Sequence, residues 1–127
     1  MGVVYHANYL LYFEDARTDF VETIAMPYSE IEAAGFMCPI YSIDIHYNSP
    51  MRYGDKGFVV TTVSKNSPMK VTYHQRIFLD GMDPDNDRPL VDAHITACML
   101  ERATFKPVSF KRELPDLYEK YQAAVEP

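Results

Sequence analysis

The sequence is poor in cysteine and has no long apolar run. Its 127 residues include two cysteines, Cys38 and Cys98, with no metal-ligand spacing around either. We expect both to be buried free thiols, because intracellular disulfides are rare. No apolar run approaches the roughly 20 residues that cross a bilayer, and the N-terminus lacks the basic flank and apolar block of a signal peptide. These absences argue against a membrane span and favour a cytoplasmic protein.

Basic charge is also scarce. Twelve Lys and Arg stand against 18 Asp and Glu, which gives a formal net charge of −6. This balance opposes nucleic acid binding, which normally relies on a basic face. The chain has no glycine-rich phosphate loop. His46, His74 and His94 fall on three predicted strands without a shared short spacing, so the sequence predicts no metal site.

The chain contains one helix pattern followed by strand patterns. From Asn8 to Met26 the apolar positions recur at steps of three or four, which predicts an amphipathic helix with Asn8 as N-cap and Pro27 as its stop. Alternation and turn signals then predict four long strands and a terminal helix. Together they indicate a single α+β domain with an antiparallel sheet wrapped around a central helix. The predicted ranges are 41–48, 58–64, 71–79, 90–102 and, for the terminal helix, 116–124.

The segment Gly2-Val3-Val4-Tyr5-His6-Ala7-Asn8-Tyr9 resembles the opening of the hotdog-fold acyl-CoA thioesterases of the 4-hydroxybenzoyl-CoA thioesterase type. In that family an Asp and two variable residues precede a Gly, apolar residues, an aromatic, often a His, and a Tyr three positions further on. The resemblance implies a hotdog fold and hydrolysis of an acyl thioester without metal or redox cofactor. Further matches are the helix 9–22, the stretch His46-Tyr47-Asn48-Ser49-Pro50 with Gly54-Asp55 after it, and Phe105-Lys106-Pro107.

The chain departs from this family at its start. Counting back from Gly2, the family's catalytic Asp would lie two residues upstream of Met1, and its first strand further upstream still. We expect residues 1–127 to be one hotdog domain that is N-terminally incomplete, and the alternative is a variant that has lost the acid. The chain as given should then bind acyl-CoA and hydrolyse it weakly. A non-catalytic acyl-thioester binding or interaction module is the competing function.

The resemblance implies that the start of the helix carries the chemistry. The backbone N–H of His6 is the candidate oxyanion donor, because the first turn of a helix leaves N–H groups unpaired and carries partial positive charge. The His6 ring could instead bond the substrate or simply pack. Tyr5 is a further catalytic candidate, although core packing is the alternative. Glu14 is the fallback base, since some hotdog thioesterases carry their carboxylate on this helix; otherwise it forms an ordinary helical pair with Arg17 or Thr18.

The expected substrate is an acyl-CoA or acyl-carrier-protein thioester. Coenzyme A phosphates would need local basic side chains at strand ends and turns, although each of these is otherwise a plain solvated charge. The candidates are Arg52, Lys65, Lys70, Arg102 and Lys106 for the phosphates, and Gly2, Val4, Asn8, Tyr9 and Phe13 for the acyl thioester. The resemblance implies a homodimer or homotetramer, and a thin sheet with an open edge also favours association.

Overall fold

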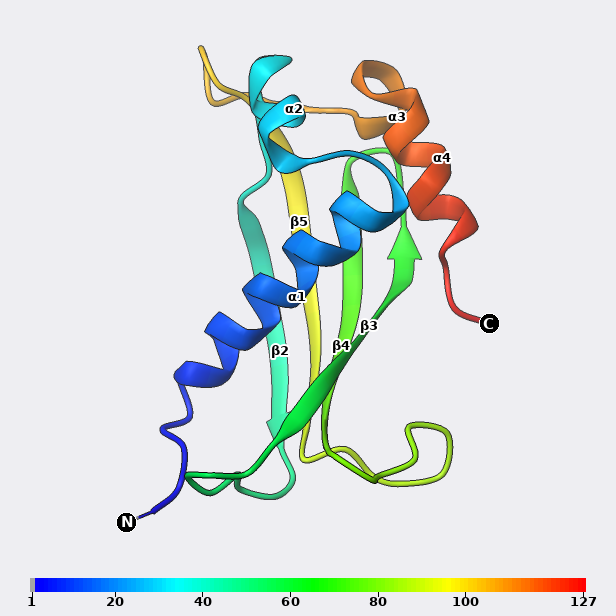
Figure 1. Cartoon of the computed structure of the whole chain (residues 1–127). Coiled ribbons are helices and arrows are strands. Elements are labelled where there is room, and N and C mark those ends of the chain that lie inside the picture. Colours follow the sequence, from blue (N-terminus) through cyan, green and yellow to red (C-terminus); the bar gives the residue numbers. More distant parts are fainter. Residues whose placement is uncertain (1) are drawn as a thin grey trace.

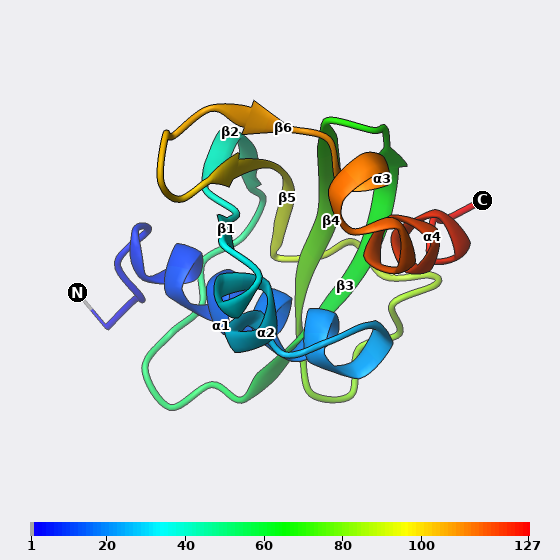
Figure 2. The same cartoon turned by 90° about the horizontal axis from the view of Figure 1, so that it is seen from above.

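The computed structural model describes residues 2–127 and shows a long helix laid across a curved antiparallel sheet (Figure 1; Figure 2). Helix α1 (Asn8–Ile24) runs diagonally over the inner face of this sheet. The expected α+β hotdog arrangement is therefore confirmed. The other elements, in chain order, are α2 (Tyr28–Ala33), β1 (Phe36–Met37), β2 (Ile40–Tyr47), β3 (Gly57–Asn66), β4 (Lys70–Leu79), β5 (Val91–Glu101), β6 (Pro107–Val108), α3 (Phe110–Glu113) and α4 (Pro115–Ala123).

The four long strands follow the order β2–β5–β4–β3, and every strand pair is antiparallel. The short strands β1 and β6 both pair with the end of β5. Sequence alternation located the long strands to within about two residues, but it missed β1 and β6 because a two-residue strand shows no period.

Of the helices in residues 2–127, none combines the length and apolar character needed to span a bilayer.

Helix α1 begins one residue earlier than its predicted cap implies. The N-cap is Ala7, which already has helical backbone angles (φ −70°, ψ −21°), and Asn8 is the first helical residue, so the predicted capping role of Asn8 is wrong. The reason lies in the hydrogen bonding of the turn before the helix. The Asn8 N–H donates to the carbonyl of Tyr5 at 2.9 Å, so a turn precedes the helix and leaves the Asn8 side chain exposed.

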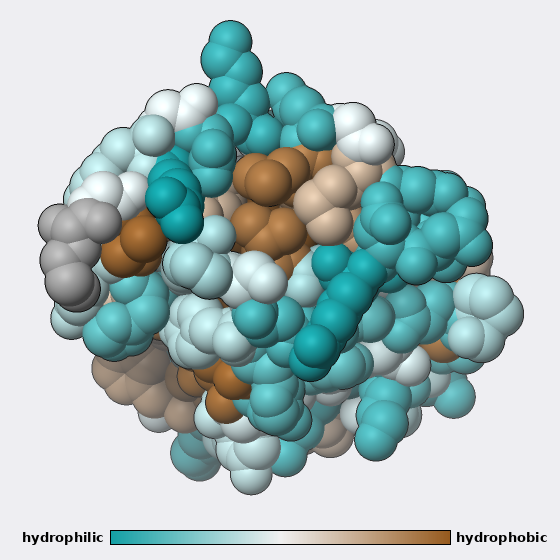
Figure 3. All heavy atoms as spheres, turned by 90° about the horizontal axis from the view of Figure 1, so that it is seen from below, coloured by the Kyte–Doolittle hydropathy of each residue, from teal (hydrophilic) through white to brown (hydrophobic). Residues whose placement is uncertain are grey.

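Two apolar clusters fill the space between α1 and the sheet. One contains Val21 and lies under α2 and α4, and the other contains Tyr9 and Phe13 and lies at the start of α1. Partly buried side chains such as Val59 and Leu79 pack against the second cluster. Seen from below, this end of the molecule carries an apolar patch framed by polar side chains (Figure 3).

A buried amide joins α1 to the sheet. Gln75 on β4 is 0 % exposed, and its Nε2 donates to the Phe13 carbonyl at 2.9 Å and to Thr61 Oγ1 at 3.1 Å. Arg17 on α1 donates to the Gln75 Oε1 at 3.0 Å. Both ends of the amide are thereby paired, as a buried polar group requires.

Replacing Gln75 should loosen α1. We expect Gln75→Leu to lower the free energy of unfolding by about 2 kcal/mol, because half-buried Arg17 loses its acceptor and desolvated partners stay unpaired. The matched control Gln122→Leu lies on the exposed face of α4 and should change stability by less than about 0.5 kcal/mol. Urea denaturation measures both. Equal losses for the two variants would contradict the bridging role of Gln75.

Candidate active site

The segment before α1 is tied down by the loop that follows β2. The Val4 N–H donates to the Met51 carbonyl at 2.8 Å, and the Tyr53 N–H donates to the Gly2 carbonyl at 3.0 Å. Gly2 has φ +71°, a left-handed conformation that glycine adopts without strain. These contacts hold Gly2 and Val4 as structural neighbours of the helix start.

The helix start presents unpaired backbone donors on an exposed surface. Within residues 2–127, the N–H groups of His6 and Ala7 have no hydrogen-bond partner. The His6 side chain is exposed, its ring centroid lies 4.4 Å from that of Tyr5, and its carbonyl accepts from the Tyr47 hydroxyl at 3.4 Å. Tyr5 is 60 % exposed. An anion or a polarised oxygen can therefore approach the helix N-terminus from solvent.

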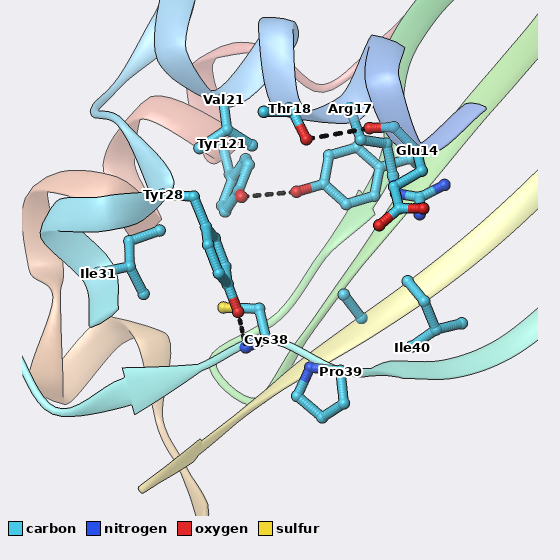
Figure 4. A pocket seen from close by; sticks show the side chains of 12 residues that line it. Glu14, Arg17, Thr18, Val21, Tyr28, Ile31, Cys38, Pro39, Ile40 and Tyr121 are labelled. Carbon is cyan, nitrogen blue, oxygen red and sulfur yellow. Dashed lines mark hydrogen bonds between the residues drawn. The ribbon is translucent and has the colours of Figure 1, made fainter. Parts of the chain in front are cut away.

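A pocket of about 360 Å³ lies beside the middle of α1. Glu14, Arg17, Thr18 and Val21 share one helical face and form one wall. Figure 4 shows Glu14 on the same side of the pocket as Ile40, with Tyr28 and Ile31 on the other side. The remaining lining residues come from α2, the β1–β2 link, the start of β2, the inner face of the sheet and α4: Tyr28, Ile31, Cys38, Pro39, Ile40, Tyr73, Ala97 and Tyr121.

The deep part of the pocket keeps its ionisable groups neutral. The hydroxyls of Tyr73 and Tyr121 are hydrogen-bonded at 2.6 Å, and burial raises the pKa of both. Burial also raises the pKa of the Cys38 thiol to about 12, with a further contribution from Cys98. Since the thiolate is the nucleophilic form, Cys38 is not a nucleophile near neutral pH. Glu14 is exposed, and it supplies the carboxylate among the described lining residues.

Burial and neighbouring side chains act on the pKa of Arg17 in opposite directions. Its burial lowers the pKa of the guanidinium, while Tyr73 and then Glu14 act in the opposite direction. The guanidinium is committed to Gln75, and no salt bridge joins it to Glu14 among residues 2–127. Thr18 donates its hydroxyl to the backbone carbonyl of Glu14 at 3.1 Å and not to the carboxylate, which has no hydrogen-bond partner among residues 2–127. The helical Glu14–Arg17 pair that the sequence offered as an alternative is therefore absent from this described part of the chain.

Other predicted residues lie away from this pocket. Tyr9 and Phe13 are 3 % and 0 % exposed and belong to the core, and the Tyr9 hydroxyl accepts from the Met51 N–H at 3.0 Å. Contact with an acyl group was expected for both, but burial leaves them no open surface.

Three of the basic side chains expected to bind phosphates lie in two separate places. Lys65 and Lys70 line one surface hollow together. Arg102 lines a different hollow and donates to the Glu32 carbonyl at 3.3 Å.

Sequence reasoning missed the floor of the pocket. Tyr73 lies in the predicted strand 71–79 and is buried on the inner face of β4, but nothing in the sequence indicated that Tyr121 of α4 would meet it. The expectation that the histidines are scattered was also wrong for two of them. His74 and His94 lie opposite each other on β4 and β5 with ring centroids 4.4 Å apart, because strand register joins residues that are distant in the chain.

Comparison with known proteins identifies the family. The Thioesterase-like superfamily profile matches residues 1–120, and the chain belongs to this family. The YneP protein of Bacillus subtilis strain 168 is 31 % identical over 124 residues, which cover 98 % of this chain and 86 % of that protein. The acyl-CoA thioesterase YbgC of Haemophilus influenzae is 28 % identical over 114 residues, which cover 89 % and 79 %.

A solved structure has the same architecture. A DHNA-CoA thioesterase from Staphylococcus aureus superposes with a TM-score of 0.85 at 29 % sequence identity, covering 97 % of this chain and 79 % of that one. The family and the architecture implied by the resemblance of the opening motif are confirmed.

Proposed function

We propose that this chain is an acyl-CoA thioesterase, which hydrolyses an acyl thioester to a carboxylic acid and a free thiol. The observation that carries the proposal is that α1 bears both an exposed helix start with unpaired N–H groups and, on the wall of a pocket, the carboxylate of Glu14. The family, and relatives named acyl-CoA and DHNA-CoA thioesterases, support it. Oxyanion donors and a base that activates water are what thioester hydrolysis requires.

The proposed chemistry uses His6 and Glu14 on one substrate carbonyl. Glu14 takes a proton from water as the water oxygen attacks the carbonyl carbon, and the His6 N–H stabilises the oxyanion. The C–S bond then breaks, and the leaving thiolate receives the proton from Glu14. Six residues of helix from Asn8 to Glu14 rise by about 9 Å, and a helical side chain leans toward the N-terminus. His6 lies in the turn just before this helix, and the proposal places one water and one carbonyl between the two groups.

The pocket suggests where the acyl group lies. Its deep end is formed by Tyr28, Ile31, Val21 and the paired hydroxyls of Tyr73 and Tyr121, which are neutral at physiological pH. An apolar acyl chain or ring can enter such a space without stranding a charge. The carrier would remain in solvent, with Lys65, Lys70 or Arg102 available to phosphates. Coenzyme A and a carrier protein both fit this arrangement.

Glu14→Gln should abolish most turnover. Loss of a general base typically lowers the rate about 10²- to 10⁴-fold, and the amide keeps the size of the side chain. The matched control is Asp15→Asn, the next residue, which lines a different hollow and should retain activity within about threefold of wild type, because it faces away from the proposed base. Thiol release from a panel of short, long and aromatic acyl-CoAs measures the rates.

The same assay separates hydrolysis from binding. Wild-type protein that binds acyl-CoA tightly without releasing thiol would identify a non-catalytic acyl-thioester binding module. Substantial turnover that survives in Glu14→Gln would show that a different group activates the water.

His6 should act through its backbone more than through its ring. We expect His6→Ala to keep most of the activity, because it preserves the N–H, whereas His6→Pro removes that donor and should lower kcat by about 10²-fold or more. Far-UV circular dichroism and the KM of both variants check that α1 still forms and the substrate still binds. Loss of nearly all activity in His6→Ala would assign the role to the imidazole.

We also propose that two copies associate through β2. Within residues 2–127 this strand pairs only with β5, so its other edge offers unpaired backbone groups. Ile40, Tyr41, Ile43 and Tyr47 along it are 41–62 % exposed. Ile40 also lines the pocket and Tyr47 contacts His6. A second copy on this edge would therefore cover apolar surface and border both parts of the site.

Sedimentation velocity tests this association. Wild type should be at least a dimer at micromolar concentration, and Ile43→Lys should weaken the dimer at least about 10-fold, because a charged side chain on an exposed edge opposes strand pairing. The control Met69→Lys alters a similarly exposed apolar residue at the β3–β4 turn and should leave the dimer intact. A monomeric wild type would contradict the proposal.

A further inference from the structure

The outer face of the sheet carries a cluster of histidine and aspartate that the thioesterase chemistry does not use. His74 on β4 lies directly opposite His94 on β5, and Asp92 is two residues before His94 on the same face. One potential ligand atom from each of the three lies within 4.8 Å of the others. The two imidazole rings are parallel to within 7°, with centroids 4.4 Å apart. All three side chains are half-buried, so the cluster is open to solvent on one side.

Two carboxylates lie against the two ring nitrogens of His74. Its Nε2 lies 2.8 Å from Asp92 Oδ1, and its Nδ1 lies 3.2 Å from both carboxylate oxygens of Glu126. A neutral imidazole has one N–H and one lone pair, so it can donate to only one of these carboxylates. The other carboxylate then faces a lone pair. A second proton on the ring or a cation bound at Nε2 removes that conflict, and a bound cation also gives the neighbouring nitrogen of His94 a partner.

We propose that His74, Asp92 and His94 form a binding site for one divalent transition-metal ion of the zinc class. Two imidazole nitrogens and one carboxylate oxygen are a ligand set that such ions accept, with water completing the coordination. Metal bonds of about 2.0–2.2 Å would draw the three ligand atoms closer together, which rotation of their side chains allows. The site is structural, and it lies on the sheet face opposite α1.

Glu126 provides the outer support that metal-binding histidines usually have. A ligating imidazole commonly donates its second N–H to a carboxylate, which orients the ring. Glu126 receives this hydrogen bond from His74 Nδ1 and also accepts from the Thr62 hydroxyl at 2.7 Å. Its own N–H donates to the Val63 carbonyl at 2.7 Å. Metal binding would therefore link β4, β5 and the C-terminal segment that covers part of the β3 edge.

The surrounding charge favours a cation. The carboxylates of Asp92 and Glu126 face the cluster, and Asp44 on β2 lies opposite His94 in register. Arg76, opposite Asp92, brings a positive charge, but its guanidinium donates to the Pro84 carbonyl at 3.3 Å. Three carboxylates against this one guanidinium leave the local balance negative.

Calorimetric titration of chelator-treated, dialysed protein with Zn²⁺ tests the site. Wild type should bind one ion per chain, and His94→Gln should weaken binding at least about 10-fold by removing a ligand, with a loss of about 10-fold in Glu126→Gln. The control His6→Gln removes an exposed histidine outside the cluster and should bind within twofold of wild type. No saturable binding in wild type, or equal losses in His94→Gln and His6→Gln, would overturn the proposal.

Paramagnetic NMR of the unaltered protein gives an answer that does not depend on variant folding. Substoichiometric Cu²⁺ should selectively broaden the imidazole signals of His74 and His94, while those of His6 persist. Broadening centred on His6, or on Cys38 and Cys98, would place the ion elsewhere and overturn the assignment.

Discussion

The position of α1 depends on one buried amide. Gln75 projects from β4 into an apolar interior, where an unpaired amide would be costly. It is satisfied by the backbone of α1 at Phe13, by Thr61 and by Arg17. This requirement sets how the helix lies on the sheet more specifically than apolar contact does, because apolar packing tolerates shifts that hydrogen bonds do not. It also engages the Arg17 guanidinium, which forms no salt bridge with Glu14 among residues 2–127.

For the proposed function, the consequence of this buried amide is that the Glu14 carboxylate has no salt bridge with Arg17. A helical carboxylate three residues before an arginine would ordinarily pair with it. With Arg17 held by Gln75, the Glu14 carboxylate faces the pocket unpaired. The turn before the same helix leaves the His6 N–H without a hydrogen-bond partner among residues 2–127. In the proposed mechanism, the Glu14 carboxylate on α1 and the His6 N–H in the turn before α1 act on the same carbonyl.

The two faces of the sheet have separate chemistry because side chains alternate along a strand. On β4, Tyr73, Gln75 and Ile77 point toward α1, while His74 and Arg76 point outward. The inward residues build the pocket floor and the helix support. The outward residues join those of β5 in a polar cluster that the C-terminal Glu126 completes. The proposed ion site therefore lies on the face of the sheet opposite the pocket.

The sequence by itself determined the long elements, because their signals are local: a three-to-four period for α1 and alternation for the long strands. Its opening motif was specific enough to name the family. It also singled out Glu14 on the helix and His6 just before it as candidates. Only the tertiary structure decided that Tyr9 and Phe13 are core residues, that Tyr121 meets Tyr73, and that His74 meets His94. These pairs are 20 to 48 residues apart in the chain, by subtraction of their numbers. Strand register and helix docking bring them together, and neither leaves a periodic mark in the sequence.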